Sequence, residues 1–192
     1  AITLVYVDST KGWVNVQNAE DTETGVVAAY VTASGGCVAT VGDFKIHTFN
    51  ADANFVLSDG GNNKGSNKIE YLVVGGGGAG GSDKGYTGGG GGGAGGYRFS
   101  NGTSAGSYCA GPSPLGATAI TGLSAATYPI SVGAGGATTS SGSRNPGSIS
   151  NFDTITSTGG GGGGSIDWPG PFANSSGAPG GSGGGAHPAA RD

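Results

Sequence analysis

The sequence predicts a mainly β protein with almost no helix, in which a β region precedes a glycine-rich half. Three observations predict this architecture. Short runs of β-branched and aromatic residues fill the first part of the chain, all but eight of the 46 glycines follow residue 70, and no segment has a sustained 3.6-residue hydrophobic period. We therefore expect a β-rich attachment or oligomerisation region over 1–74 and a glycine-rich rod-and-loop domain over 75–192.

The N-terminal region predicts a series of short strands. Residues 2–7 and 13–17 are rich in β-branched and aromatic side chains and flank the turn-forming segment 8–12, so we expect them to form a hairpin. Residues 25–31 are apolar at both odd and even positions, which predicts a strand buried on both faces. Further strands are expected over 43–49, 54–58 and 68–74.

The glycine-rich half consists of glycine runs separated by short inserts. A glycine run cannot supply side chains to a core, but an extended left-handed helix with three residues per turn has no internal hydrogen bonds and can bond to neighbouring rods. We expect packed polyglycine-II-like rods joined by loops, with a glycine-rich β-sandwich as the alternative. A flexible linker is disfavoured because the inserts carry aromatic and β-branched residues. Replacing the central Gly91 by Val is expected to block rod packing and unfold this half.

Composition excludes several classes of partner. The net charge is −4 and the sequence pI is about 4.9, and there is no run of Lys or Arg, which argues against binding to nucleic acid or anionic membranes. No apolar stretch reaches the length of about 18 residues that spans a bilayer, so we expect no membrane insertion. Cys37 and Cys109 could form one disulfide or be two buried thiols, and the sequence leaves this open.

Two segments match functional motifs in their letters alone. Residues 75–80 fit the dinucleotide-binding G-x-G-x-x-G pattern, but the residues that follow cannot form the helix that such sites need. Residues 180–184 fit the G-x-S-x-G nucleophile turn without the strand and helix that flank it. His47 and His187 have no second ligand at a metal-site spacing. We expect no catalytic, cofactor-binding or metal-binding residue, and a protein that is not an enzyme.

Aromatic residues in the inserts are the candidates for recognition. Tyr and Trp rings stack on sugars and lose little conformational entropy on binding. Tyr86, Tyr108 and Trp168 lie in or beside loops expected at the ends of rods, so they are the predicted receptor contacts. Tyr97 and Phe99 are instead expected to pack over the glycine layers.

Several blocks resemble the glycine-rich modules of tailed-bacteriophage virion proteins. These blocks are Thr3–Trp13, Gly42–Phe49, Ile69–Gly78, Gly90–Arg98 and Ile130–Gly136, so the resemblance spans nearly the whole chain. Some glycine-rich phage adhesins are built from packed polyglycine helices with host specificity in the loops at the rod ends. The resemblance implies a place on the virion surface and offers no catalytic motif.

The leading hypothesis is a non-enzymatic virion structural protein, a tail fibre or its receptor-binding tip, that contacts the bacterial surface. Its expected partners are a host cell-surface glycan or protein, other virion proteins and further copies of itself, a trimer being favoured. The alternative is a purely structural fibre or capsid-decoration module that binds no ligand. A polyglycine ice-binding protein is disfavoured, because the inserts are irregular and would break a flat, regular face.

Overall fold

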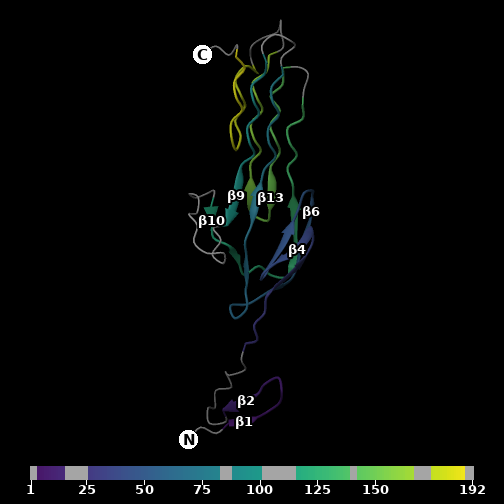
Figure 1. Cartoon of the computed structure of the whole chain (residues 1–192), viewed down its shortest axis with the longest axis vertical. Coiled ribbons are helices and arrows are strands. Elements are labelled where there is room, and N and C mark those ends of the chain that lie inside the picture. Colours follow the sequence, from purple (N-terminus) through teal and green to yellow (C-terminus); the bar gives the residue numbers. More distant parts are fainter. Residues whose placement is uncertain are drawn as a thin grey trace.

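The computed structural model describes residues 4–15, 26–82, 88–100, 116–138, 142–166 and 174–188. Over these residues the chain forms several small β-sheets, none closed into a barrel, and helix is essentially absent. Figure 1 shows the glycine-rich rods standing above the sheets, with the N-terminal hairpin below them. The predicted fold class, mainly β with almost no helix, is confirmed.

The largest sheet has five antiparallel strands in the order β14-β13-β12-β6-β3. A second sheet pairs β8 with β9 in antiparallel fashion and adds β10 in parallel, and three two-stranded pairs complete the set: β1 with β2, β4 with β5, and β7 with β11. In chain order the strands are β1 (Leu4–Tyr6), β2 (Trp13–Asn15), β3 (Val31–Ser34), β4 (Cys37–Val41), β5 (Phe44–Thr48), β6 (Ala53–Gly60), β7 (Lys68–Ile69), β8 (Leu72–Val74), β9 (Tyr97–Ser100), β10 (Gly116–Ala117), β11 (Ile120–Thr121), β12 (Ala126–Ser131), β13 (Ser150–Phe152) and β14 (Ile155–Ser157).

A small hydrophobic core lies between the five-stranded sheet and β8. Its buried members are Phe55, Leu57, Val73 and Phe152. The Phe55 ring meets the rings of His47 and Phe152 edge to face, with centroids 5.3 and 5.8 Å apart. Because Val73 and Phe152 stand close to the starts of glycine rods, this core holds the bases of the rods in register.

Most of the expected strands are found. The hairpin over 2–7 and 13–17 is confirmed by the β1–β2 pair, 43–49 contains β5, and 54–58 lies within β6. The run 68–74 divides into β7 and β8. No strand was expected over β4, and β3 begins at the last residue of the expected strand 25–31.

The expectation of a doubly buried strand over 25–31 is wrong. Val26 and Val27 are 63% and 78% exposed, and the strand begins only at Val31. Hydrogen bonds to Asn62 and Ser66 hold the segment instead of a ladder. Asn62 Nδ2 donates to the Val27 carbonyl at 2.8 Å and Asn62 Oδ1 accepts from the Ala29 N–H at 3.2 Å, while the Ala29 carbonyl accepts from the Asn62 and Ser66 N–H groups at 3.0 and 3.2 Å. The apolar residues of this segment therefore predicted burial, whereas the segment is exposed and is bonded to the polar side chain of Asn62.

Replacing Asn62 by Ala is expected to loosen this loop. Asn62 Oδ1 also accepts from the N–H groups of Lys64 and Gly65, both at 3.0 Å, so the change leaves several backbone groups without their partner. The expected cost is about 1–3 kcal/mol of stability, with faster hydrogen exchange of the Ala29 and Gly65 amides. Exposed Asn63 is the matched control, and equal exchange rates in Asn62→Ala and Asn63→Ala would contradict the assigned role.

Seven glycine-rich rods are interspersed with strands β9 to β14 in the described part of residues 75–192. We number them in chain order: rod 1 (75–82), rod 2 (88–96), rod 3 (132–138), rod 4 (142–149), rod 5 (158–166), rod 6 (174–178) and rod 7 (181–187). Rods 1 and 2 are joined by three hydrogen bonds, in which the N–H groups of Gly75, Gly78 and Gly81 donate to the carbonyls of Gly96, Gly93 and Gly90 at 2.8 Å.

The hydrogen bonds between rods repeat every third residue, which is one turn of a polyglycine II helix. A β-ladder would bond with a period of two. The expected packed rods are therefore present, and the β-sandwich alternative does not describe this half.

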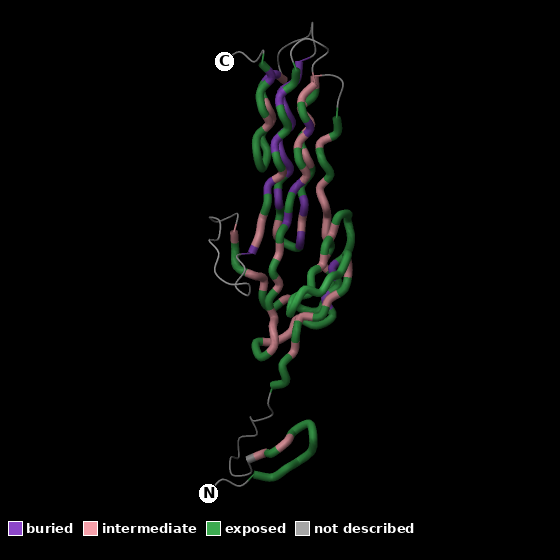
Figure 2. Tube along the Cα trace, in the orientation of Figure 1, coloured by how far each residue is buried: buried purple, intermediate pink, exposed green. Residues whose placement is uncertain are grey.

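Hydrogen-bond partners define the arrangement of the rods. Rods 3, 1 and 2 form one layer and rods 4, 5 and 7 form a second, with rod 6 bonded to rods 5 and 7. Rod 5 exchanges hydrogen bonds with rods 1, 2, 4, 6 and 7, and its residues 159–166 are all buried. Figure 2 shows this buried stretch in the middle of the array. Rod 5 is thus the buried centre of the array, and it is formed mainly by backbone atoms.

The expectation for Gly91 is wrong in its choice of residue. A Cβ built at Gly91 meets nothing within 4 Å, because this glycine lies on the exposed side of rod 2. A Cβ at Gly163 in rod 5 would instead collide with the carbonyl oxygen of Gly90 and would lie 2.6 Å from the nitrogen of Gly81. The steric requirement for glycine is therefore confined to positions that face another rod.

Candidate functional site

The chain reverses direction at one end of the rod array, where the described flanks of two predicted contacts lie. Rods 1 and 5 run parallel to each other and antiparallel to rod 2. Rods 1 and 5 therefore end beside the start of rod 2, at the end of the array that lies farther from the β-sheets in Figure 1. We call this end, formed by Ser82, Gly88, Ser165 and Asn174, the distal end.

Polar side chains join the rods at the distal end. The Ser165 hydroxyl donates to the Ser82 carbonyl at 2.7 Å and accepts from the Ser82 N–H at 3.0 Å. The Ser165 N–H donates to the Asn174 carbonyl at 2.8 Å, and Asn174 Nδ2 donates to the Gly142 carbonyl. Because Ser165 is fully buried, these bonds hold the ends of rods 1, 4, 5 and 6 at fixed separations.

The three predicted receptor contacts all fall outside the described residues. Tyr86 belongs to the insert between rods 1 and 2, and Trp168 to the insert between rods 5 and 6. The described residues that flank these two inserts meet at the distal end. Tyr108 belongs to the insert between Ser100 and Gly116, which lie in β9 and β10 at the opposite end of the rods. The flanks of two of the three inserts thus lie together at the distal end, and the flanks of the third lie at the opposite end.

The two glycine motifs are parts of rods. In residues 75–80, the N–H groups of Gly75, Gly76, Gly78 and Ala79 already donate to carbonyls of other rods, so they do not converge on a phosphate. Ser182 lies in rod 7, where its N–H donates to Ala94 and its carbonyl accepts from Gly161. Both matches come from glycine content, and the structure gives neither segment the strand–turn–helix geometry of its motif.

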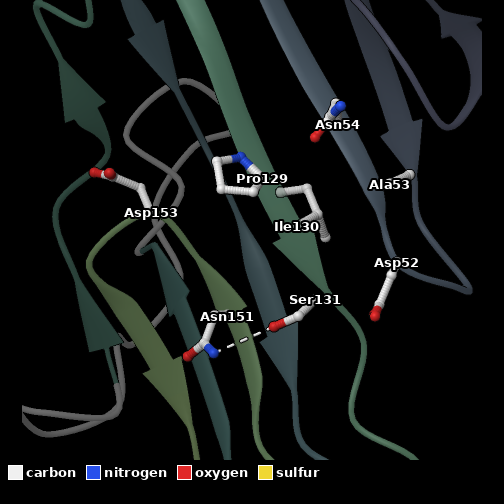
Figure 3. Close-up of a pocket in the computed structure, with 8 residues that line it drawn as sticks. All are labelled: Asp52, Ala53, Asn54, Pro129, Ile130, Ser131, Asn151 and Asp153. Atoms are coloured by element: carbon white, nitrogen blue, oxygen red, sulfur yellow. Dashed lines mark hydrogen bonds between the residues drawn. The ribbon is translucent and has the colours of Figure 1, made fainter.

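A polar groove lies on the outer face of the five-stranded sheet, and the sequence reasoning did not find it. Its volume is about 570 Å³. The lining residues, drawn in Figure 3, are Asp52, Ala53, Asn54, Pro129, Ile130, Ser131, Asn151 and Asp153. The register that pairs Asn54 with Pro129 and Asn151 with Ser131 could have revealed it, because paired residues of antiparallel strands share a face.

The groove offers hydrogen-bonding groups without a catalytic pair. One carboxylate oxygen of Asp52 accepts from the Val132 N–H at 2.7 Å, and Asn151 Nδ2 donates to the Ser131 hydroxyl at 3.2 Å. No histidine, cysteine or lysine lines it to activate that hydroxyl.

The Asp8 carboxyl is stabilised in its charged form by backbone hydrogen bonds. Hydrogen bonds from the Lys11 and Thr10 N–H groups hold the pKa of the Asp8 carboxyl below its ordinary value, at an exposed turn of the β1–β2 hairpin. Among the described residues, no group of three His, Cys, Asp or Glu is placed to hold a metal ion. The same residues contain no helix of the length and apolarity needed to cross a membrane. Cys37 is an exposed free thiol, and Cys109 lies outside the described residues.

Comparison with known protein families returns a match that agrees with this architecture. The model of a family described as a glycine-rich domain matches residues 58–192, which include β8 and all seven rods. The chain belongs to this glycine-rich domain family. No curated protein and no solved structure matches the chain significantly. As a member of the family, this chain shows how glycine runs can form an ordered domain, through three-residue hydrogen-bond repeats between antiparallel and parallel rods.

Proposed function

We propose that this glycine-rich domain protein is a non-enzymatic structural protein of a bacteriophage virion, a tail fibre or its receptor-binding tip, that contacts the bacterial surface. The observation that carries the proposal is the distal end of the array. Rods fixed by backbone hydrogen bonds and by the buried Ser165 hold the described flanks of two aromatic-containing inserts next to one another. The resemblance of several blocks to phage virion proteins supplies the biological context.

A rigid array suits recognition because it lowers the entropic cost of binding. Loops anchored at fixed separations lose less freedom on contact with a receptor than loops on a flexible spacer do. Tyr86 and Trp168 are the proposed anchors, and a glycan or protein of the host cell surface is the proposed partner. Tyr108 stays a candidate contact for a second surface. The β region is the proposed attachment to other virion proteins, and a homo-oligomer is proposed for the assembled fibre.

Binding to susceptible bacteria tests this function. We expect the purified chain to bind whole cells, and Tyr86→Ala or Trp168→Ala to weaken binding by on the order of 2 kcal/mol, about 30-fold, as for other aromatic anchors. Tyr30, 64% exposed in the β region, provides the control variant Tyr30→Ala, which should bind as the unchanged chain does.

The purely structural alternative predicts a different result. A chain that binds no susceptible strain, while virions carrying it still assemble, would support a fibre or capsid-decoration role. If Tyr108→Ala alone weakened binding, the receptor contact would belong to the insert at the base of the rods.

A further inference from the structure

The outer face of the layer formed by rods 3, 1 and 2 is not covered by any described segment. Along rod 1 and the strand before it, exposed residues recur at every third position: Val74, Gly77 and Gly80. A Cβ built at Gly77 or Gly80 has only one neighbour within 4 Å, at 3.8 Å in both cases. We call this surface, centred on rods 1 and 2, the open face.

Some backbone N–H and C=O groups on the open face have no hydrogen-bond partner among the described residues, whereas other N–H and C=O groups of rod 1 bond to neighbouring rods. One row of its N–H groups donates to rod 2 and a second row donates to rod 4, whereas those of Gly77 and Gly80 donate to no described residue. The carbonyls of Gly78 and Gly81 likewise accept from no described residue. In buried rod 5, by contrast, all three rows of N–H groups include members that donate to other rods. The rod array therefore ends at this face with unused donors and acceptors, as a sheet ends at an edge strand.

An apolar patch continues the open face below the rods. Leu72 is 69% exposed, Val74 52% and Tyr97 44%. Val74 is paired with Tyr97 and Leu72 with Phe99, so these four side chains share one face of the β8–β9 pair, and the Tyr97 and Phe99 rings stack with centroids 5.8 Å apart. Contiguous exposed apolar surface of this kind marks interaction sites.

We propose that two copies of this chain pack through their open faces, so that the rod lattice continues from one copy into the other. The face carries donors and acceptors in adjacent rows with the same three-residue period, so it is complementary to itself, as a two-fold interface requires. Rods 1 and 2 contain no charged residue, so pairing brings no like charges together. The open face consists of small residues, so no side chain on it would collide with a rod of the second copy.

Burial of the apolar patch supplies the main driving force. Water already bonds to the exposed N–H and C=O groups, so exchanging those bonds for bonds between copies contributes little net free energy. Leu72, Val74 and Tyr97 lose exposed apolar area on pairing, at about 25 cal/mol for each Å² removed from water. The backbone rows then fix the register of the pair. This inference rests on the homo-oligomer of the proposed function, assigns it a surface, and gives it two copies in place of the trimer favoured from the sequence.

Light scattering on the full chain over a range of concentrations tests the pairing. We expect the mass of two copies at high concentration, and Gly80→Lys should raise the dissociation constant at least tenfold by placing a charge on the open face. The matched control is Gly183→Lys in rod 7, which lies in the other layer: Gly183 is also exposed, with its nearest Cβ neighbour at 3.9 Å. Circular dichroism of both variants should match that of the unchanged chain, because neither position faces another rod.

Three results would overturn the pairing: a single-copy mass at every concentration, a three-copy mass, or equal weakening by Gly80→Lys and Gly183→Lys. Leu72→Glu provides a second variant, since it alters the apolar patch and leaves every rod residue in place. Binding to bacterial cells is measured separately, so a monomer that binds cells contradicts the pairing and leaves the host-surface function standing.

Discussion

Gly163→Ala, which adds one methyl group, is expected to destabilise the rod array by about 3 kcal/mol, at the upper end of the usual cost of overpacking. The added Cβ would collide with the Gly90 carbonyl and crowd the Gly81 nitrogen, and both neighbours are backbone atoms fixed by their own hydrogen bonds. No side-chain rotation can relieve the contact, so rod 5 must separate from rods 1 and 2. Thermal unfolding followed by far-ultraviolet circular dichroism measures the loss.

Gly91→Ala is the control for this substitution. It makes the same chemical change where a Cβ meets nothing within 4 Å, so the free energy of unfolding should stay within about 0.5 kcal/mol of the unchanged chain. Equal destabilisation by the two variants would mean that the loss of glycine flexibility, and not close packing of backbones, explains the effect. Limited proteolysis of the two proteins gives an independent readout of the same difference.

Phe55→Ala is expected to lower the free energy of unfolding by about 3–5 kcal/mol. Phe55 is 6% exposed and its ring contacts those of His47, Phe49 and Phe152 edge to face, so truncation leaves a cavity and removes three aromatic contacts. Chemical denaturation measured by intrinsic fluorescence and by circular dichroism would record the change.

The effect of Phe55→Ala should extend to the rods. The cluster around Phe55 includes Val73 and Phe152, and these residues stand close to rods 1, 4 and 5. We therefore expect faster hydrogen exchange at the base of the rods as well as in the sheet. Phe44→Ala removes a ring that is 47% exposed and should change stability by only about 0.5 kcal/mol. Rods that keep their protection in Phe55→Ala would show that the array is stable without its base.

The residue pattern was enough to predict the fold class and the rods, because both follow from local constraints. Alternating β-branched residues predicted β1, β2 and β5, and glycine runs separated by inserts with aromatic and β-branched residues predicted extended rods. The segment 26–30 was predicted wrongly, because its path depends on Asn62, a polar residue more than 30 positions away. Side-chain hydrogen bonds over such separations leave no periodic signal.

The choice of Gly91 shows a second limit of sequence reasoning. Every glycine in a run looks equivalent in the sequence, yet close packing requires glycine only where the Cα faces another rod. Which face is turned inward depends on the lattice of all seven rods. The polar groove was missed for a related reason, since its residues come from three separate segments and meet only through strand register.

The position of rod 5 in the chain has a consequence for how the protein reaches its native state. Rod 5 bonds to rod 1 between residues 84 positions apart, such as Gly160 and Gly76, and to rod 7 nearer the end of the chain. Contacts of such long range are associated with slow folding. A nascent chain that has emerged only as far as rod 4 lacks the neighbour to which rod 2 donates its hydrogen bonds. The early rods therefore acquire all their hydrogen-bonding neighbours only after rod 5 has been synthesised, and we expect folding of this half to be slow.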